Sequence, residues 1–408
     1  MFLLPLYIDP GTGSALFSII IGVAAAAYFL TRGLFLRLKV ILFRKKEIIK
    51  TQFKYIIYAE DKRYWSFFEI ILDELEKRRI YVQYLTASED DPIFFSKYNF
   101  IKGKHIGHGY KAYSYLNFLS ASFVLSTTPH LDVFQWKRSN NVKHYCHIPH
   151  MAGGILLYNI FAMDYFDSIL VPSDIEISEI RELEQARNLP EKQIITVGNT
   201  FFDRYSEKIK QIPKEEPHPF TVLVSPSWGP SALLKTYGEK LLDPLSRTDW
   251  RIIIRPHPQS KITEKPVLDN LYERYKDNAN IIWDYKYENM YSLAKSDVMI
   301  SDFSGIIYDY VFLFDKPAIV NIQNLDFRRL DAHDVDFEPY YYKALKKIGT
   351  ELNSINIENI KEEILNLSQN VEMQSIRQEV KQTMWQYYGE SGKRVVDFMI
   401  NTVEKEYN

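Results

Sequence analysis

Two short polar segments of the chain carry the residues best suited to bind an anion, and the first follows a predicted strand. Arg255 and His257 come directly after the β-branched run Arg251–Ile254, so we expect a strand that delivers both side chains to its carboxyl end. Pro256 and Pro258 flank His257 and lack backbone donors, so the chain must leave the sheet there. An Arg and a His held at a strand end can clamp a diphosphate.

The second segment, from Ser301 to Gly305, lies between a predicted strand and a predicted helix. The apolar run 298–300 predicts the strand, and apolar residues recur at helical spacing after the segment. Backbone N–H groups are free at the start of a helix, and with the positive end of the helix dipole they suit a phosphate. Ser301 and Ser304 add hydroxyl donors, and either can also cap the helix.

Taken together, these segments resemble the CDP-glycerol glycerophosphotransferase family of teichoic acid synthesis. Its members carry an Arg-x-His-Pro element, a Ser/Thr-Asp-Tyr/Phe-Ser-Ser/Gly element, a Tyr/Phe-Asp pair and a Lys/Arg-Pro. The matching elements of this chain are Arg255–Pro258, Ser301–Gly305, Tyr308–Asp309 and Lys316–Pro317. Residues 225–229 resemble a further Pro-Thr-Trp-Arg element of the family, except that Gly229 stands where a cation is common. The resemblance is specific from residue 220 to 325 and weaker from 100 to 205.

The resemblance implies a CDP-linked polyol phosphate as donor, with its diphosphate on the helix start that follows Ser301. The substrate-binding residues that we expect are Arg255, Ser301, Asp302, Ser304, Gly305, Ser227 and His108. His257 is expected among the catalytic residues.

The first half of the chain carries candidates for a catalytic base. Six of the nine histidines lie between positions 105 and 150, and a neutral imidazole that titrates at about 6.5 suits proton abstraction from a hydroxyl. The family has its base in a His-Gly element at a strand end, from which residues 146–154 depart. His147 and His150 are both candidates that spacing cannot separate. We favour His150, because the small residues 152–154 let a substrate approach the backbone.

Composition narrows the remaining possibilities. The 408 residues carry a net charge of −2, which gives no electrostatic reason to expect nucleic acid as a partner. The single cysteine, Cys146, allows neither an intrachain disulfide nor a zinc cluster and fits a reducing compartment. No His-Glu-x-x-His spacing occurs, and we interpret Asp334-Val335-Asp336 as a solvated loop. We therefore expect no metal and no cofactor.

The amino terminus carries an apolar run from Ser14 to Leu30. About 20 apolar residues span a bilayer, so the run is just long enough for a transmembrane helix. Six basic residues follow between positions 32 and 46 and none precedes the run, which predicts an external amino terminus and a cytoplasmic body at the cell membrane. The basic and apolar segment 34–43 suits a helix on an anionic membrane surface. The alternative is a buried amino-terminal helix.

The rest of the chain alternates strand-like and helix-like segments, which predicts an α/β protein with doubly wound parallel sheets. The family resemblance implies the GT-B arrangement, in which two Rossmann-like domains face a cleft. We expect an anchor, an acceptor domain, a linker, a nucleotide-binding domain and a carboxy-terminal helix that crosses back, with bounds 1–50, 51–206, 207–219, 220–375 and 376–408. No Gly-x-Gly-x-x-Gly follows the first predicted strand, 55–59, which argues against a dinucleotide dehydrogenase.

These features favour a membrane-anchored transferase that moves a polyol phosphate, glycerol phosphate first, from a CDP-linked donor to a hydroxyl of a lipid-linked polymer, with release of CMP. Three alternatives stay open. A GT-B glycosyltransferase would use the same clamp for a nucleotide sugar, a sugar-nucleotide 2-epimerase would have a related fold, and a membrane-bound scaffold would have kept the fold without activity.

Overall fold

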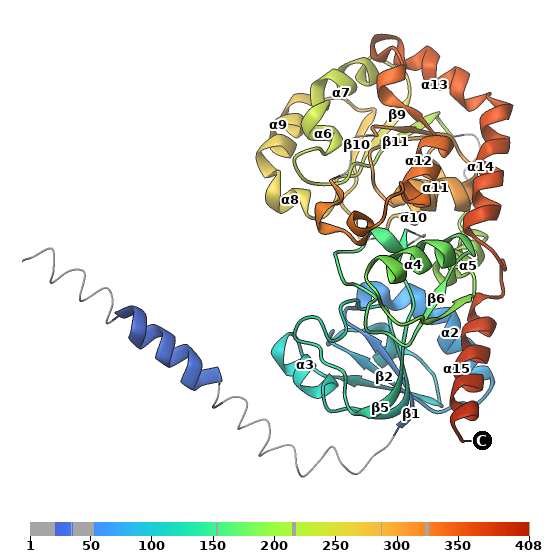
Figure 1. Cartoon of the computed structure of the whole chain (residues 1–408). Coiled ribbons are helices and arrows are strands. Elements are labelled where there is room, and N and C mark those ends of the chain that lie inside the picture. The colour runs from blue at the N-terminus through green and yellow to red at the C-terminus, as the bar shows by residue number, and fades with distance from the viewer. Residues whose placement is uncertain are drawn as a thin grey trace, which may run out of the picture.

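The computed structural model describes residues 21–33, 35, 53–151, 154–213, 218–286, 288–322 and 326–407. Within these residues the chain forms two α/β domains that lie one above the other in Figure 1. Each domain is built on a parallel sheet with helices on both faces, as the alternation of the sequence predicts.

The first domain has a seven-stranded sheet. In spatial order its strands are β3 (Ile101–His105), β2 (Val82–Thr86), β1 (Phe53–Ala59), β4 (Ser120–Ser126), β5 (Asn141–His147), β6 (Ser168–Val171) and β7 (Gln193–Thr196). The strand order reverses between β1 and β4, because β2 and β3 lie on one side of β1 and the later strands on the other. In such sheets the crevice at the reversal, outside the carboxyl ends of the strands, is where ligands bind.

The second domain has a six-stranded sheet of the same type. Its strands in spatial order are β10 (Ile281–Trp283), β9 (Arg251–Ile254), β8 (Thr221–Val224), β11 (Val298–Ser301), β12 (Ala318–Val320) and β13 (Gly349–Glu351). Here the order reverses between β8 and β11. All residues of β8, β11 and β12 are buried, which explains why these strands are apolar without a break.

Helices cover both sheets. The first domain carries α2 (Trp65–Lys77), α3 (Tyr110–Leu116), α4 (Ile175–Ala186) and α5 (Thr200–Ile209). The second domain carries α6 (Leu233–Thr236), α7 (Gly238–Ser246), α8 (Ser260–Thr263), α9 (Lys265–Tyr275), α10 (Met290–Lys295), α11 (Ile306–Phe314), α12 (Tyr340–Ile348), α13 (Ile360–Ser368) and α14 (Val371–Met384). Helix α5 ends inside the predicted linker 207–219, and α14 begins before the predicted boundary at residue 376.

The last helix, α15 (Ser391–Tyr407), returns to the first domain and packs along α2 (Figure 1). Its Val395 and Met399 are fully buried against Phe68 of α2 in the core under the first sheet. The buried carboxylate of Asp203 in α5 accepts hydrogen bonds from Trp385 Nε1 at 3.0 Å and from the backbone N–H groups of Gly389 and Ser391. The segment between α14 and α15, where the chain passes from the second domain to the first, is therefore fixed by the buried carboxylate of Asp203.

A segment of the second domain, residues 326–337, also packs on the first. Asn159 and Leu330 form an antiparallel bridge. Arg187, at the end of α4, donates to Asp164 at 2.8 Å, to Asp331 at 2.7 Å and to Asp334 at 2.7 Å. The interpretation of Asp334 as part of a solvated loop is therefore wrong, because its carboxylate belongs to an ion cluster between the domains.

Arg187→Met is expected to lower the free energy of unfolding by about 3–5 kcal/mol, because it leaves the buried carboxylates of Asp164 and Asp331 without a counter-charge. Chemical denaturation followed by circular dichroism measures the change. Arg274→Met is the control, since it breaks an exposed ion pair with Asp243 and should leave the unfolding midpoint nearly unchanged. Equal midpoints for Arg187→Met and the unaltered chain would contradict a stabilising role for the cluster.

The predicted membrane anchor is described only in part. Residues 21–33 form a helix with exposed side chains. Of the helices in the described ranges, none has both the length and the apolar character needed to cross a membrane. Residues 14–20 of the predicted span, and most of the basic segment after it, lie outside the described residues.

Candidate active site

A pocket of about 430 Å³ opens at the carboxyl edge of the second sheet, where the strand order reverses between β8 and β11. Residues that follow β8, β9, β10 and β11 line it, together with the start of α11. They are Ser225, Pro226, Arg255, Pro256, His257, Pro258, Lys261, Asp284, Tyr285, Lys286, Asn289, Ser304, Ile306 and Asp309. The structure thus brings the predicted site residues Arg255, His257 and Ser304 together. We call this cavity the donor pocket.

The guanidinium of Arg255 is fixed on the wall of the donor pocket. Its Nη1 donates to Asp284 Oδ2 at 2.6 Å and its Nη2 donates to the Lys286 carbonyl at 2.6 Å. Burial acts to raise the pKa of Asp284, but hydrogen bonds from Ser292 and Lys286 and the Arg255 charge outweigh it and lower that pKa. Asp284 therefore stays ionised, and it orients the fork of Arg255 before any ligand binds.

His257 lies on the same wall as a neutral hydrogen-bond donor. Its Nδ1 accepts the Gln259 N–H at 3.1 Å, so the neutral ring carries its proton on Nε2. Burial lowers the pKa of His257, which keeps the ring uncharged near neutral pH. Its ring stacks on Trp228 with centroids 6.2 Å apart. In this state His257 suits donation to a phosphate oxygen.

Ser304 and Gly305 form the open start of α11. Gly305 has ordinary helical angles, with φ −59° and ψ −21°, so its backbone conformation does not require glycine. A Cβ at this position would lie 3.2 Å from the hydroxyl of Tyr341. The glycine therefore makes room for Tyr341 and leaves the helix N-terminus accessible to an anion.

Ser301, Asp302 and Ser227 do not line the donor pocket but shape it. The hydroxyl of the fully buried Ser301 donates to the Ser225 carbonyl at 2.5 Å. Asp302, also fully buried, accepts the N–H groups of Ser227 and Leu233 at 2.9 Å each. These bonds tie the loop after β8 to the loop after β11, so the three residues hold the loops that form the pocket and are not part of its lining.

Asp309 lines the donor pocket one turn into α11 and was not among the predicted site residues. Burial raises the pKa of its carboxyl group to about 7. A protonated carboxyl can donate to a phosphate oxygen, whereas an ionised one repels it. The Tyr308–Asp309 pair was part of the family resemblance, but a helical Asp gives no sequence signal of burial or of its pKa.

Of the histidines of the first domain, His150 has the geometry of a base. Its Nδ1 lies 3.0 Å from the Thr127 carbonyl and 3.2 Å from the Tyr158 hydroxyl. A bond from Nδ1–H to the carbonyl puts the lone pair on Nε2. Burial lowers the pKa of His150, so Nε2 is free of a proton at neutral pH. The ring is partly exposed beside Tyr64, with centroids 4.7 Å apart.

The other two candidates among these histidines differ from His150 in burial. His147 is 0% exposed and packs against Tyr158 and Phe166, so no substrate can reach it. Burial holds the pKa of His147 well below its ordinary value. His108 is exposed in the loop before α3, with its ring 5.9 Å from that of His105. It lines neither the donor pocket nor the pocket of the first domain that Glu60, Thr128 and Trp136 line. Of the three candidates His108, His147 and His150, only His150 combines access with a fixed tautomer.

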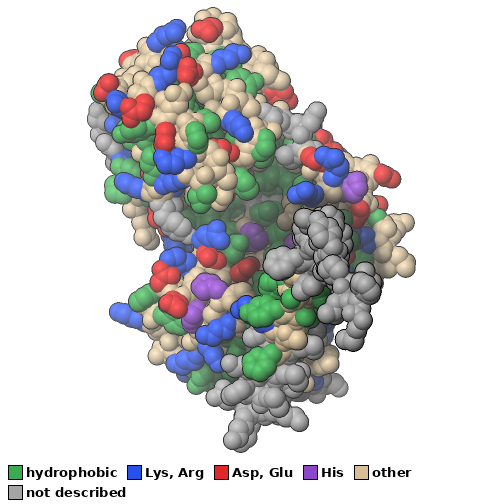
Figure 2. Space-filling model, turned by 90° about the vertical axis from the view of Figure 1, so that its left-hand side faces the viewer, with side chains coloured by type: hydrophobic (Ala, Val, Ile, Leu, Met, Phe, Trp, Pro, Cys, Tyr) green, Lys and Arg blue, Asp and Glu red, His purple; other side chains and the backbone are tan. Residues whose placement is uncertain are grey.

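Tyr341 connects the His150 loop with the start of α11. A Cβ on Gly154 would lie 2.8 Å from Cγ of Tyr341, and a Cβ on Gly305 would lie 3.2 Å from its hydroxyl. One tyrosine ring therefore fills the space between the two loops. Figure 2 shows the molecule hollowed between its domains, with hydrophobic and histidine side chains in the hollow. Tyr341 thus contacts both the loop that follows the candidate base and the start of α11, beside the donor pocket.

Glu176 of α4 holds the His150 loop from behind. Its Oε1 accepts the Gly154 N–H at 2.9 Å, and Gly154 has a φ of +84° that favours glycine. Burial, and then the neighbouring Glu179, raise the pKa of Glu176 to about 8. The carboxyl group is therefore mostly protonated in the folded protein at neutral pH.

Glu176→Gln is expected to gain stability over the unaltered chain as the pH rises. Folding raises the pKa of Glu176 from 4.5 to about 8. Between these pH values mainly the unfolded state loses this proton, so the unaltered chain becomes less stable as the pH rises from 4.5 to about 8. Glutamine does not titrate, so the difference in melting temperature should grow from pH 5 to pH 8.5. The control is Glu182→Gln, on the exposed side of α4. If the difference in melting temperature between Glu176→Gln and the unaltered chain did not change with pH, the raised pKa of Glu176 would be refuted.

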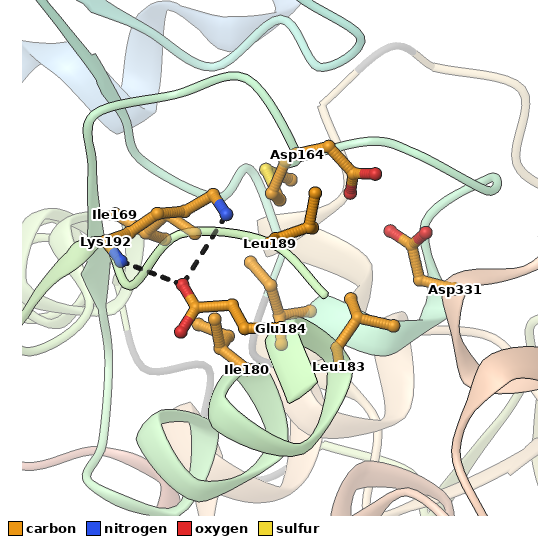
Figure 3. A pocket seen from close by; sticks show the side chains of 10 residues that line it. Asp164, Ile169, Ile180, Leu183, Glu184, Leu189, Lys192 and Asp331 are labelled. Atoms are coloured by element: carbon orange, nitrogen blue, oxygen red, sulfur yellow. Dashed lines mark hydrogen bonds and ion pairs between the residues drawn. The ribbon is translucent and has the colours of Figure 1, made fainter. Parts of the chain in front are cut away.

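A smaller cavity of about 10 Å³ lies beside α4 (Figure 3) and has room for about one water molecule. At the edge of this cavity, Glu184 Oε1 accepts hydrogen bonds from both nitrogens of Lys192. The backbone N–H lies at 2.9 Å and Nζ at 3.5 Å. This cavity is too small for a substrate. The described part of the chain also contains no group of three or more His, Cys, Asp or Glu side chains that would hold a metal ion.

Comparison with known proteins gives a family. A model of the family described as CDP-glycerol:poly(glycerophosphate) glycerophosphotransferase matches residues 169–401. This stretch runs from β6 into α15 and includes the whole second sheet. No curated protein matches the chain.

Solved structures share the fold. The wall teichoic acid polymerase TagF superposes with a TM-score of 0.53 at 15% identity, over 87% of this chain and 90% of that chain. A TagF variant soaked with CDPG superposes with 0.55 at 15% identity, over 93% and 98%. The UDP-GlcNAc 2-epimerase of Methanocaldococcus jannaschii, in complex with UDP-GlcNAc and UDP, gives 0.56 at 16% identity, over 85% and 99%. At such identities the likeness concerns the fold alone.

Proposed function

Because the chain belongs to the CDP-glycerol:poly(glycerophosphate) glycerophosphotransferase family, we propose that it transfers glycerol phosphate from CDP-glycerol to a hydroxyl of a lipid-linked cell-surface polymer. The product class is a teichoic acid, and CMP is released. The observation that carries the proposal is the donor pocket, where Arg255, neutral His257 and the open start of α11 at Ser304 converge on one cavity.

The donor pocket supplies positive charge and donors for a diphosphate. The preorganised fork of Arg255 offers a charge-assisted contact, and Lys261 and Lys286 add two further cations to the lining. Ser304 and Ile306, on either side of the α11 N-cap Gly305, line the same cavity, and the first N–H groups of a helix suit a phosphate. This arrangement stabilises the charge that leaves with CMP.

His150 takes the proton of the acceptor in the proposed mechanism. The acceptor hydroxyl transfers its proton to Nε2 of His150 as its oxygen forms a bond to the phosphorus that bears glycerol. The bond from this phosphorus to the CMP oxygen breaks, and CMP keeps the electron pair. Such a step requires mostly positioning and charge stabilisation from the protein.

The membrane location is part of the proposal. In the described helix 21–33, the apolar side chains of Ile21 and Leu30 are 52% and 68% exposed, and apolar surface of this kind favours burial in lipid. A lipid-linked acceptor would meet the enzyme at the bilayer surface. Fractionation of cells tests this point: the full chain should sediment with membranes, and a variant without residues 1–35 should not. Sedimentation of both would refute the anchor.

Nucleotide release by the detergent-solubilised chain tests the function itself. CDP-glycerol labelled in its glycerol phosphate, CDP-ribitol and UDP-sugars are each offered with a lipid-like acceptor. We expect CMP release from CDP-glycerol and transfer of the label to the acceptor. Release of UDP from a UDP-sugar, with none from CDP-glycerol, would make the chain a glycosyltransferase and overturn the proposal.

Asp309→Asn is expected to remove a pH dependence of donor binding. With its pKa at about 7, Asp309 is mostly neutral at pH 6 and mostly ionised at pH 8.5, where it repels the diphosphate. The Kd of the unaltered chain for CDP-glycerol should therefore rise by about tenfold over this range, as for a repulsion of about 1.4 kcal/mol. Titration calorimetry at both pH values measures it. The control variant Asp269→Asn, at an exposed site of α9, should keep the pH dependence of the Kd. If Asp309→Asn also kept this pH dependence, the proposed repulsion between Asp309 and the diphosphate would be contradicted.

A further inference from the structure

A second pocket, of about 490 Å³, lies in the first domain at the place that corresponds to the donor pocket. Glu60 follows β1, and Thr128 and Pro129 come soon after β4. The pocket therefore opens where the strand order of the first sheet reverses, outside the carboxyl ends of β1 and β4. Each domain thus has a pocket where the strand order of its sheet reverses. The proposed donor site uses only the pocket of the second domain.

This second pocket is a neighbour of the proposed base. The Thr127 carbonyl that lies 3.0 Å from His150 Nδ1 directly precedes Thr128 of the pocket wall. Tyr64, whose ring is 4.7 Å from that of His150, lies at the end of the short helix η2 (Lys62–Tyr64) that begins two residues after Glu60. Residues directly next to the pocket wall in the chain therefore contact the candidate base.

The wall of this pocket is largely aromatic; its lining residues include His130 but no Lys or Arg. Tyr113, Phe134 and Trp136 supply the rings, and Phe134 is 64% exposed. Trp136 is 2% exposed, and its Nε1–H has no hydrogen-bond partner among the described residues. The buried Thr128 hydroxyl likewise lacks a partner within that part of the chain. Aromatic rings with a few polar groups among them are typical of a site for a small organic ligand.

Glu60 is the acidic group of the pocket. Its side chain is partly buried. Burial, and then the nearby Asp61, raise the pKa of Glu60, although the Tyr113 hydroxyl beside it acts in the opposite direction. A carboxylate accepts hydrogen bonds from neighbouring hydroxyls. The nearby Arg63 also acts to lower the pKa of Glu60, but its guanidinium is already paired with Asp61 at 2.9 Å. An ionised Glu60 therefore repels a phosphate group in the pocket.

We propose that this pocket binds the end of the acceptor as an uncharged sugar ring, with Glu60 accepting hydrogen bonds from its hydroxyls and Phe134 covering its apolar face. The inference rests on the proposed function, because it takes a hydroxyl-bearing acceptor as given. It adds the class of that acceptor: the terminal unit is a neutral sugar, and a chain of glycerol phosphates fits the pocket less well.

Titration of the full detergent-solubilised chain without donor tests the pocket apart from catalysis. The probes are octyl N-acetylglucosaminide and an octyl-linked dimer of glycerol phosphate. We expect the glycoside to bind more tightly. Glu60→Gln should weaken its binding by at least about tenfold, the usual cost of losing a hydrogen bond to a charged group. Phe134→Ala, at an exposed position that folding does not require, should weaken it by several-fold.

Matched controls come from the same domain. Glu89→Gln alters an exposed carboxylate near the end of the adjacent strand β2, and Phe95→Ala removes an exposed ring outside the pocket. Both should bind the glycoside as the unaltered chain does. Tighter binding of the glycerol phosphate dimer, or equal losses in controls and pocket variants, would overturn the proposal.

Turnover with CDP-glycerol separates this inference from the proposed function. CMP release with the glycoside as acceptor, with a raised KM for the glycoside and an unchanged KM for CDP-glycerol in Glu60→Gln, supports both. CMP release with the glycerol phosphate dimer alone leaves the transferase intact and overturns the sugar acceptor. Binding of the glycoside without CMP release from either acceptor supports the pocket and overturns the transfer reaction.

Discussion

His150→Ala is expected to lower kcat for glycerol phosphate transfer by about 10²–10⁴-fold, the usual contribution of a general base. The affinity for CDP-glycerol should stay nearly unchanged, because the donor pocket is formed by the second domain. The substitution removes Nε2, whose lone pair is set by the contact of Nδ1 with the Thr127 carbonyl. Rates of CMP release at saturating acceptor, together with donor titrations, separate the two effects.

The pH profile gives an independent measure of the same assignment. Since burial lowers the pKa of His150, the neutral base persists to more acidic pH than for an ordinary histidine. The acid limb of kcat should therefore have its midpoint below about 6.5, and this limb should vanish from the residual rate of His150→Ala. His333→Ala, at an exposed histidine, is the control. An unchanged kcat in His150→Ala would remove this residue from the mechanism.

Arg255→Ala is expected to raise the Kd for CDP-glycerol by about 10²-fold. Loss of a charge-assisted contact costs up to about 3 kcal/mol, and this guanidinium is only 11% exposed and already oriented by Asp284. Titration calorimetry with CDP-glycerol measures the effect, and the acceptor titration should not change.

A second substitution protects this test against a folding defect. Arg255→Lys keeps a positive charge beside the buried Asp284 but lacks the planar fork, so it should fold and still weaken donor binding by about tenfold. Arg274→Ala, which breaks an exposed ion pair on α9, should bind the donor normally. Donor affinities equal to that of the unaltered chain in both Arg255 variants would show that the diphosphate lies elsewhere.

The arrangement of the domains was largely predictable from local patterns. The apolar run 55–59 and the β-branched run 251–254 predicted strands that the structure contains as β1 and β9. The helix that the alternation of segments predicts after the first strand is α2 (Trp65–Lys77). Strands buried on both faces are apolar without a break, and a helix with one buried face has a period that can be read directly.

The assignment of site residues depended more on the tertiary structure. Arg255 and Ser304 were predicted together and share the donor pocket. Ser301 was predicted as a ligand-binding residue, yet its hydroxyl is buried on the Ser225 carbonyl. Asp309 lines the pocket without having been predicted there. Residue type and spacing indicate which groups can contact a phosphate, but not which of them other parts of the chain already bind.

The sequence by itself determined the two parallel-sheet domains, the clustering of anion-binding residues at strand ends and the family. These features are local, because a strand end and the loop after it are continuous in the chain. Only the tertiary structure separated His150 from His147, since two histidines three residues apart differ only in what packs on them. It also decided that Tyr341 fills the space between Gly154 and Gly305, a contact between residues far apart in the chain that no local pattern encodes.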